Sequence, residues 1–356
     1  MKGRRPPIRA VPQTRERTVR SRSIVRNPIV VTCLLLGASL GVLGPRTQAQ
    51  QLGEPTILAL DQINMVNYNE DTFDITRFAT LSAITPTTLQ PTLTNALGLA
   101  DITTVNGVPA RGLHIYRFTK VDSATTLTVG RSLADVTRLS WISHVWEIMT
   151  ADGVSIGTIM AQGMAAGVPP PGSHAAVQSA NLAIVGGTGA YAGIRGVVGN
   201  AAPLVAGAAR QASVREDPAY RRVNGGGNAR FIFTLYPGDA PQVVSITHAD
   251  SNPVTDRNPA VAGETLTVVA SGLGPTSPSV SPGQAFPASP QLRVNAPVAV
   301  LVNGRPAQVS TVIGLPGAVN RYLLYFQVPA GTTRGLTSVQ LTSAWLGGPG
   351  ALVWVN

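Results

Sequence analysis

Short runs of β-branched and aromatic residues, separated by turn-forming residues, recur along the chain after residue 50. The turn signals between them include NED, ADG and NGGGN, and charged residues are sparse. This pattern favours strands and turns over helices. The runs are TILALDQINMVNYN, FDITRFATLSAI, RGLHIYRFTKV, TTLTVGRSL, SWISHVWEIMT, GVSIGTIMAQGM, SANLAIVG, AYAGIRGVVG and ARFIFTLYP. About eight strands between residue 50 and the end of ARFIFTLYP predict an antiparallel barrel or sandwich. Residues 85–110 and 200–227 are less regular and are predicted to be loops or insertions.

A second β domain is predicted after YPGDAPQ, residues 236–242, where Pro and Gly cluster before a new strand. Further short strands follow, and Asn303-Gly304 is typical of a two-residue hairpin turn that requires positive φ. The remaining length suits an immunoglobulin-like sandwich. We therefore expect an all-β chain, with an eight-stranded antiparallel barrel over residues 50–239 and a β-sandwich over residues 240–356.

Residues 1–49 have the three parts of a secretory signal peptide: a basic region, the apolar run IVVTCLLLGASLGVLG and the small-residue pattern RTQAQQ. We expect cleavage after Ala49 and a protein that is secreted, periplasmic or attached to the cell envelope. The apolar run is short and glycine-rich for a membrane span, so the cleaved chain is not expected to be an integral membrane protein. A retained N-terminal anchor is the alternative. Because Cys33 is the one cysteine, the cleaved chain is expected to carry neither a disulfide nor a thiolate metal site.

The positive charge of the chain is concentrated at its front. The formal net charge is +10, but ten of the 27 Lys and Arg residues lie in residues 1–49 beside a single acid, Glu16. The rest of the chain is close to neutral, so it lacks a basic stripe that would neutralise phosphates. We therefore expect no nucleic-acid partner.

The stretch AIVGGTGAYAGIRG, residues 183–196, matches a relaxed dinucleotide-binding fingerprint at Gly187, Gly189 and Ala192. That fingerprint works only when a helix begins at its last small residue and presents backbone amides to a phosphate. Here β-branched residues, further glycines and a proline follow, so a tight turn between two strands is favoured. The residues expected to form this structural motif are Gly186, Gly187, Gly189, Tyr191, Gly193 and Gly196.

Two parts of the chain resemble known families. GTIMAQG (157–163), the glycine stretch and GGGNARFIFTLYP (225–237) resemble, in order and spacing, the allene oxide cyclase and dirigent-like barrel family. This resemblance covers roughly residues 110–237 and implies an eight-stranded antiparallel barrel with an apolar lumen. Plant members cyclise a fatty-acid epoxide or steer radical coupling in a hydrophobic pocket, and only the glycine motif carries over residue by residue.

In the second domain, VAGETLTVVASGLGPT, VLVNGRPAQV and YFQVPAG resemble the immunoglobulin-like domains of the IPT/TIG class, which end many bacterial exported proteins. The match covers about residues 241–356. It implies a spacer or attachment module.

The candidate ligand-binding residues lie on two of the predicted strands. Strand alternation in SWISHVWEIM places His144 and Trp146 on one face, and in RGLHIYRFTK it places His114, Tyr116 and Phe118 on one face. If these faces line the barrel, they make an apolar pocket wall with a few polar tips. The candidate residues are therefore His114, Tyr116, His144 and Trp146, and the alternative is that they are packed or rim residues of a sheet.

Other chemistry has little support in the sequence. The histidines form no HxxH or HExxH pair, and no nucleophile elbow with a partnered base is present, so neither a metal nor a cofactor is expected. DSNPVTD, beginning at Asp250, departs from a calcium loop at Val254 and is read as a polar loop. The acidic turn NYNEDTFD (67–74) is read as a solvated hairpin tip, with weak binding of a hard cation as the alternative.

Three functions follow from these observations. The first is an exported bacterial binding or scaffold protein, whose barrel holds a small apolar ligand and whose second domain is a spacer or attachment module. The second is an enzyme of the isomerase or cyclase type that acts by positioning its substrate in the lumen. The third is a purely structural surface protein. Association of barrels into a homo-oligomer is compatible with all three.

Overall fold

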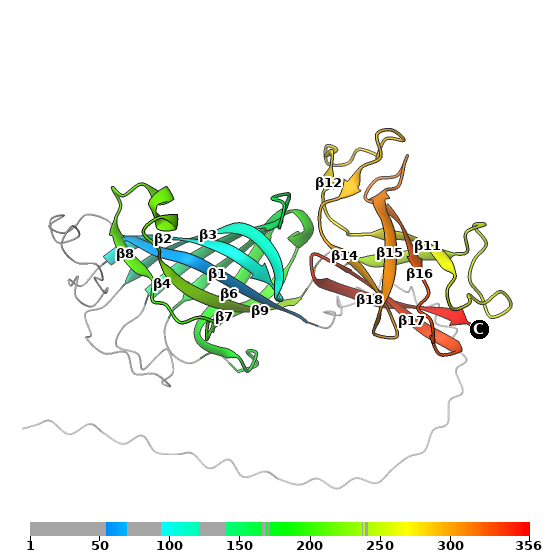
Figure 1. The fold of residues 1–356 in the computed structure, drawn as a ribbon, viewed down its shortest axis with the longest axis horizontal. Coiled ribbons are helices and arrows are strands. Elements are labelled where there is room, and N and C mark those ends of the chain that lie inside the picture. The colour runs from blue at the N-terminus through cyan, green and yellow to red at the C-terminus, as the bar shows by residue number, and fades with distance from the viewer. Residues whose placement is uncertain are drawn as a thin grey trace, which may run out of the picture. The chain divides into compact units, whose positions relative to one another are not determined.

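The computed structural model describes residues 55–69, 94–120, 140–165, 169, 171–236, 238 and 241–356. The predicted signal peptide, with Cys33, and the strands predicted at residues 73–84 and 125–133 lie outside these residues. Within the described part, no helix has the length and apolar character needed to cross a membrane. The described strands form two sheets (Figure 1).

The first sheet is a closed barrel of eight antiparallel strands, as the sequence predicts. Its strand order is β2-β3-β4-β5-β6-β7-β9-β1, and β1 pairs with β2 to close it. A short extra strand, β8 (Arg210–Ser213), runs parallel to the last residues of β1. The eight strands are β1 (Thr56–Asn69), β2 (Thr94–Val105), β3 (Val108–Lys120), β4 (Ser140–Thr150), β5 (Ser155–Met164), β6 (Val177–Gly187), β7 (Arg195–Ala201) and β9 (Gly227–Tyr236).

The barrel lumen is filled by alternate residues of these strands. In β4, Ile142, His144, Trp146 and Ile148 are buried while their neighbours are more exposed. In β9, Phe231, Phe233 and Leu235 belong to the same hydrophobic core. Because successive side chains of a strand point to opposite faces, this alternation separates the lumen from the outer surface.

The expectation of a loop over residues 85–110 is wrong for its second part. Residues Thr94–Val105 form β2, one of the longest strands, and β3 begins at Val108. Asn106 and Gly107 join them with φ values of 50° and 75°, the left-handed backbone of a two-residue hairpin. Ala96, Gly98 and Ala100 in β2 are residues of low strand propensity. The expectation for residues 200–227 also misses β8, which supplies four residues of strand there.

The glycine stretch forms the predicted turn between antiparallel strands. β6 ends at Gly187, a three-residue 3₁₀ helix, η2 (Gly189–Tyr191), follows, and β7 starts at Arg195. Gly189 has a φ of 63°, and a Cβ there would meet the backbone oxygen of Ile156 at 2.4 Å. Tyr191 is fully buried beneath the turn. Since η2 is followed directly by a strand, the stretch presents no helical N-terminus of the kind that a dinucleotide-binding loop uses.

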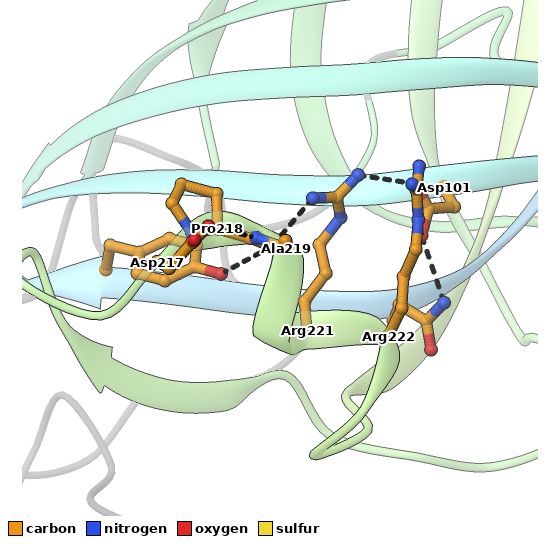
Figure 2. Close-up of polar contacts among 8 residues, drawn as sticks. Asp101, Asp217, Pro218, Ala219, Arg221 and Arg222 are labelled. Atoms are coloured by element: carbon orange, nitrogen blue, oxygen red, sulfur yellow. Dashed lines mark hydrogen bonds and ion pairs between the residues drawn. The ribbon is translucent and has the colours of Figure 1, made fainter.

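A second 3₁₀ helix, η3 (Pro218–Arg222), is hydrogen-bonded to Asp101 on the outer face of β2 (Figure 2). The carboxylate of Asp101 accepts hydrogen bonds from Arg221 Nη2 at 2.7 Å, from Arg222 Nη2 at 2.7 Å and Nε at 3.0 Å, and from Asn64 Nδ2 at 3.0 Å. Arg221 also donates to the carbonyl of Pro218. Burial by itself would raise the pKa of Asp101, but the hydrogen bonds from Arg222, Asn64 and Arg221 lower it to about 2.

The second sheet is antiparallel and nearly closed. Its strands follow the order β10-β11-β16-β15-β14-β17-β18, with the short strands β12 and β13 beside β15. Leu266, Val268, Leu324 and Phe326 lie in its core. The strands are β10 (Gln242–Thr247), β11 (Thr265–Ser271), β12 (Thr276–Ser277), β13 (Arg293–Val294), β14 (Val298–Val302), β15 (Arg305–Gly314), β16 (Tyr322–Gln327), β17 (Gly335–Ser343) and β18 (Leu346–Val355).

The hairpin predicted at Asn303-Gly304 is confirmed. The two residues have φ values of 49° and 74°, and Val302 pairs with Arg305 across the turn. A Cβ on Gly304 would meet no atom within 4 Å, so only the backbone conformation opposes a side chain there. We expect Gly304→Ala to lower the free energy of unfolding by about 1 kcal/mol. Urea denaturation checks this, and Gly304→Asn, which tolerates left-handed backbone, should recover part of the loss.

Candidate functional site

All four predicted ligand-binding residues lie on the inner face of the barrel, on β3 and β4. The register pairs His114 with Trp146 and Tyr116 with His144 across the two strands. The two sequence runs that carry these residues are therefore neighbours, and their side chains share one layer of the lumen. Gly98 on β2 makes room for the phenol, since a Cβ there would lie 1.9 Å from the Tyr116 ring.

Two buried hydrogen bonds link the polar groups of this layer. His114 Nε2 and His144 Nδ1 lie 2.7 Å apart, and the hydroxyl of Tyr116 donates to Asn67 Oδ1 at 2.5 Å. Two imidazoles in such contact require one ring to donate and the other to accept. We call His114, His144, Tyr116 and Asn67 the lumen polar cluster.

Aromatic rings stack against the lumen polar cluster. Trp146 lies nearly parallel to both imidazoles, with ring centroids 4.8 Å from His144 and 4.6 Å from His114. Phe231 on β9 meets the same rings edge-on. These contacts fix the orientation of the imidazoles, because offset-stacked and edge-to-face arrangements are favourable for aromatic groups.

Burial keeps the lumen polar cluster uncharged at neutral pH. It lowers the pKa of His144 to about 3, and burial together with the neighbouring His144 lowers the pKa of His114 well below its usual value. Burial also raises the pKa of the Tyr116 hydroxyl. A charged form would lose its hydration without a compensating partner, so each group stays in its neutral form.

Access to this layer increases toward one end of the barrel. His114 and Trp146 have an exposed fraction of 0%, whereas the fraction is 4% for His144, 7% for Tyr116 and 9% for Phe118. Side chains thus fill the lumen around His114 and Trp146. Along β3 and β4 the exposed fraction increases toward the end where β3 finishes and β4 begins, whereas Asn69 on β1 and Ala96 on β2 at the same end are 0% exposed.

Several polar atoms of the lumen have no hydrogen-bond partner among the described residues. They include His114 Nδ1 and Trp146 Nε1 in the layer just described. Asn69 Oδ1 and Gln62 Oε1 on β1 are also buried without a partner. Since buried polar groups in proteins are nearly always paired with protein groups, ordered water or a ligand, these atoms are donors and acceptors that such a molecule would satisfy.

The amide side chains of this site were not among the residues predicted from the sequence. Asn67 and Asn69 were assigned to a solvated hairpin tip, but both are buried residues of β1. Asn69 donates to Gln211 Oε1 on β8 at 3.0 Å. A bulge around Asn64, which has a φ of 54°, shifts the alternation of β1, so no strict two-residue pattern in the sequence identifies them. Residues 70–74 of that predicted turn lie outside the described residues.

The other candidates form no comparable site. His174 is exposed, and His248 directly follows β10, where its Nδ1 lies 2.5 Å from Glu264 Oε1. The carboxylate of Asp250 accepts hydrogen bonds from the backbone and side chain of Asn252, as in a polar loop. The described residues hold no group of three or more His, Cys, Asp or Glu side chains that suits a metal ion.

A separate hollow of about 350 Å³ lies on the barrel and does not include the four candidate residues. Its polar wall carries Asp61, whose carboxylate is already bound by Arg230 and Thr104. Its apolar wall carries Leu204 and Val205, which are exposed. Because Arg230 and Thr104 already bind the Asp61 carboxylate, this carboxylate does not indicate which ligand the hollow would take.

Comparison of the chain with protein-family models, with curated proteins and with solved structures finds no match.

Proposed function

We propose that this chain is an exported binding protein whose barrel, of the dirigent-like kind, holds a small and largely apolar ligand in its lumen. The observation that carries the proposal is the lumen polar cluster, buried among aromatic rings and accompanied by unpaired polar atoms. Packing of the lumen does not require the polar side chains of this cluster, since apolar residues of similar volume fill a core at least as well. An apolar cavity with a few convergent polar groups is the usual form of a small-molecule site.

The ligand site lies between the lumen polar cluster and the end of the barrel at which β3 finishes. His114 and Trp146 are sealed, so they form the floor and do not touch the ligand. Tyr116, His144 and Asn67 face the accessible side, where Phe118 and Ile142 supply apolar walls. The second sheet serves as a spacer or attachment module in this proposal, in line with its likeness to the IPT/TIG class.

The chemistry of the cluster favours positioning over acid–base catalysis. A base whose conjugate acid has a pKa of about 3 takes up a proton poorly at neutral pH. The alternative function is thus an isomerase or cyclase that only holds its substrate in a reactive shape. A purely structural role is the outcome if the barrel holds nothing.

Native mass spectrometry of the full chain, purified without detergent, tests the proposal first. We expect a retained small molecule, or a rise of the melting temperature with one class of lipophilic compound. Ile142→Phe narrows the accessible side of the lumen and should abolish that stabilisation. Ser143→Phe places the same ring on the outer face and serves as the matched control. A chain of apo mass that no lipophilic compound stabilises would contradict ligand binding and favour the structural role.

A further inference from the structure

We infer that the barrel lumen selects uncharged ligands and excludes anions. This inference rests on the proposed function, since it specifies the ligand of the same site. It follows from where the charged side chains of the barrel strands lie, and from the neutral polar groups that replace them inside.

The charged residues of β1, β2, β3, β4 and β9 whose side chains the structure describes face outward. Asp61 on β1 pairs with Arg230 on β9, with 2.7 Å between Arg230 Nε and Asp61 Oδ1. Asp101 on β2 binds the arginines of η3. On β3, Arg111 and Arg117 are exposed and alternate with the buried residues His114, Tyr116 and Phe118.

β4 repeats this arrangement. Glu147 lies between Trp146 and Ile148, whose side chains are buried, so its own side chain is on the opposite face. Between Gly112 and Phe118 of β3, and along β1, β4 and β9, the inward-facing residues that the structure describes include no carboxylate, ammonium or guanidinium group. A charged ligand would therefore lose its hydration without gaining a counter-ion in the lumen.

The inner polar groups offer hydrogen bonds without charge. Imidazole, phenol, indole and amide groups line the layer, and the histidines stay neutral because burial disfavours their protonated forms. Asn69 Oδ1 is a buried acceptor that has no partner among the described residues. An uncharged molecule with an apolar frame and one hydroxyl, carbonyl or aromatic amine group meets these requirements. A free carboxylate or sulfonate does not.

Two fluorescent probes with one ring skeleton test the inference on the full chain. N-phenyl-1-naphthylamine is neutral, and 8-anilino-1-naphthalenesulfonate adds a single sulfonate. We expect saturable binding of the neutral probe, with an affinity at least about ten-fold higher than that of the sulfonate, a difference of about 1.4 kcal/mol. Binding of the neutral probe should be lost in Ile142→Phe and kept in Ser143→Phe.

A charge placed inside the lumen provides the converse test. Ile142→Lys adds an ammonium group on the accessible side, whereas Ser143→Lys adds it on the outer face. The ratio of sulfonate to neutral affinity should rise at least about ten-fold in the first variant and stay unchanged in the second. If Ile142→Lys does not fold, the affinities of the two probes for the unmodified chain still decide whether the lumen excludes anions.

The outcomes separate the two proposals. Equal affinities for both probes, with both lost in Ile142→Phe, would overturn charge selection and leave ligand binding intact. Tighter binding of the sulfonate would overturn charge selection in the same way. Binding of neither probe, together with an apo mass in native mass spectrometry, would overturn ligand binding itself.

Discussion

Lowering the pH from 7 to 4 is expected to reduce the free energy of unfolding by about 3 kcal/mol through His144 alone. The pKa of this residue is about 3 in the folded barrel, against 6.5 in the unfolded chain. Between about pH 6.5 and pH 3, His144 therefore binds a proton in the unfolded chain but stays unprotonated in the folded barrel. Stability falls with pH from about 6.5 to about 3, and His114, whose pKa is lowered for the same reason, adds to the loss.

The pH range over which His144 changes the stability differs from the ranges of Asp101 and His248. Asp101 has a pKa of about 2, so its contribution is lost only between about pH 4 and pH 2. The hydrogen bond to Glu264 raises the pKa of His248, which directly follows β10, so its contribution is present at low pH and is lost as the pH rises. His248 thus acts in the opposite direction to His144.

Urea denaturation at pH 7, 5.5 and 4 measures the effect. In His144→Gln the fall in stability between pH 7 and pH 4 should be smaller by about 3 kcal/mol than in the parent chain. His174→Gln is the matched control for the loss of an imidazole, because His174 is exposed. Identical pH profiles for the parent and His144→Gln would show that His144 is not held neutral by burial.

Asp101→Asn is expected to lower the free energy of unfolding at pH 7 by about 3 kcal/mol. The substitution removes the carboxylate that pairs with Arg221, whose side chain is buried with an exposed fraction of 7% (Figure 2). The guanidinium then remains in the protein interior without a counter-ion, which costs far more than the loss of a surface ion pair. Because Asp101 also holds Arg222 and Asn64, the attachment of η3 to β2 weakens as a whole.

The control for this prediction is Arg222→Gln. The side chain of Arg222 is 63% exposed although it contacts the same carboxylate, so its removal should cost less than about 1 kcal/mol. Limited proteolysis between η3 and β9 gives a second readout, since loosening of this segment should make Asp101→Asn more sensitive than Arg222→Gln. Equal losses of stability in both variants would contradict the distinction between the buried and exposed arginines.

The sequence by itself determined the class of fold and much of the inner face of the barrel. Alternation in SWISHVWEIMT identified Ile142, His144 and Trp146 as one face, and all three are buried. Asn303-Gly304 identified a hairpin, and the glycines of residues 183–196 identified a turn. These are local properties: the two-residue period of a strand and the need for positive φ act within a few residues, so they can be read without knowledge of the partner strands.

The composition of the site was decided only by the tertiary structure. His114 and His144 lie 30 residues apart, and the 2.7 Å contact between their rings depends on the register of β3 with β4. Asn67 meets Tyr116 only because β1 and β2 close the barrel, and the bulge near Asn64 brings Asn67 and Asn69 inside. Register, closure and bulges are set by packing summed over the whole sheet, so no short stretch of sequence specifies which buried polar groups will meet.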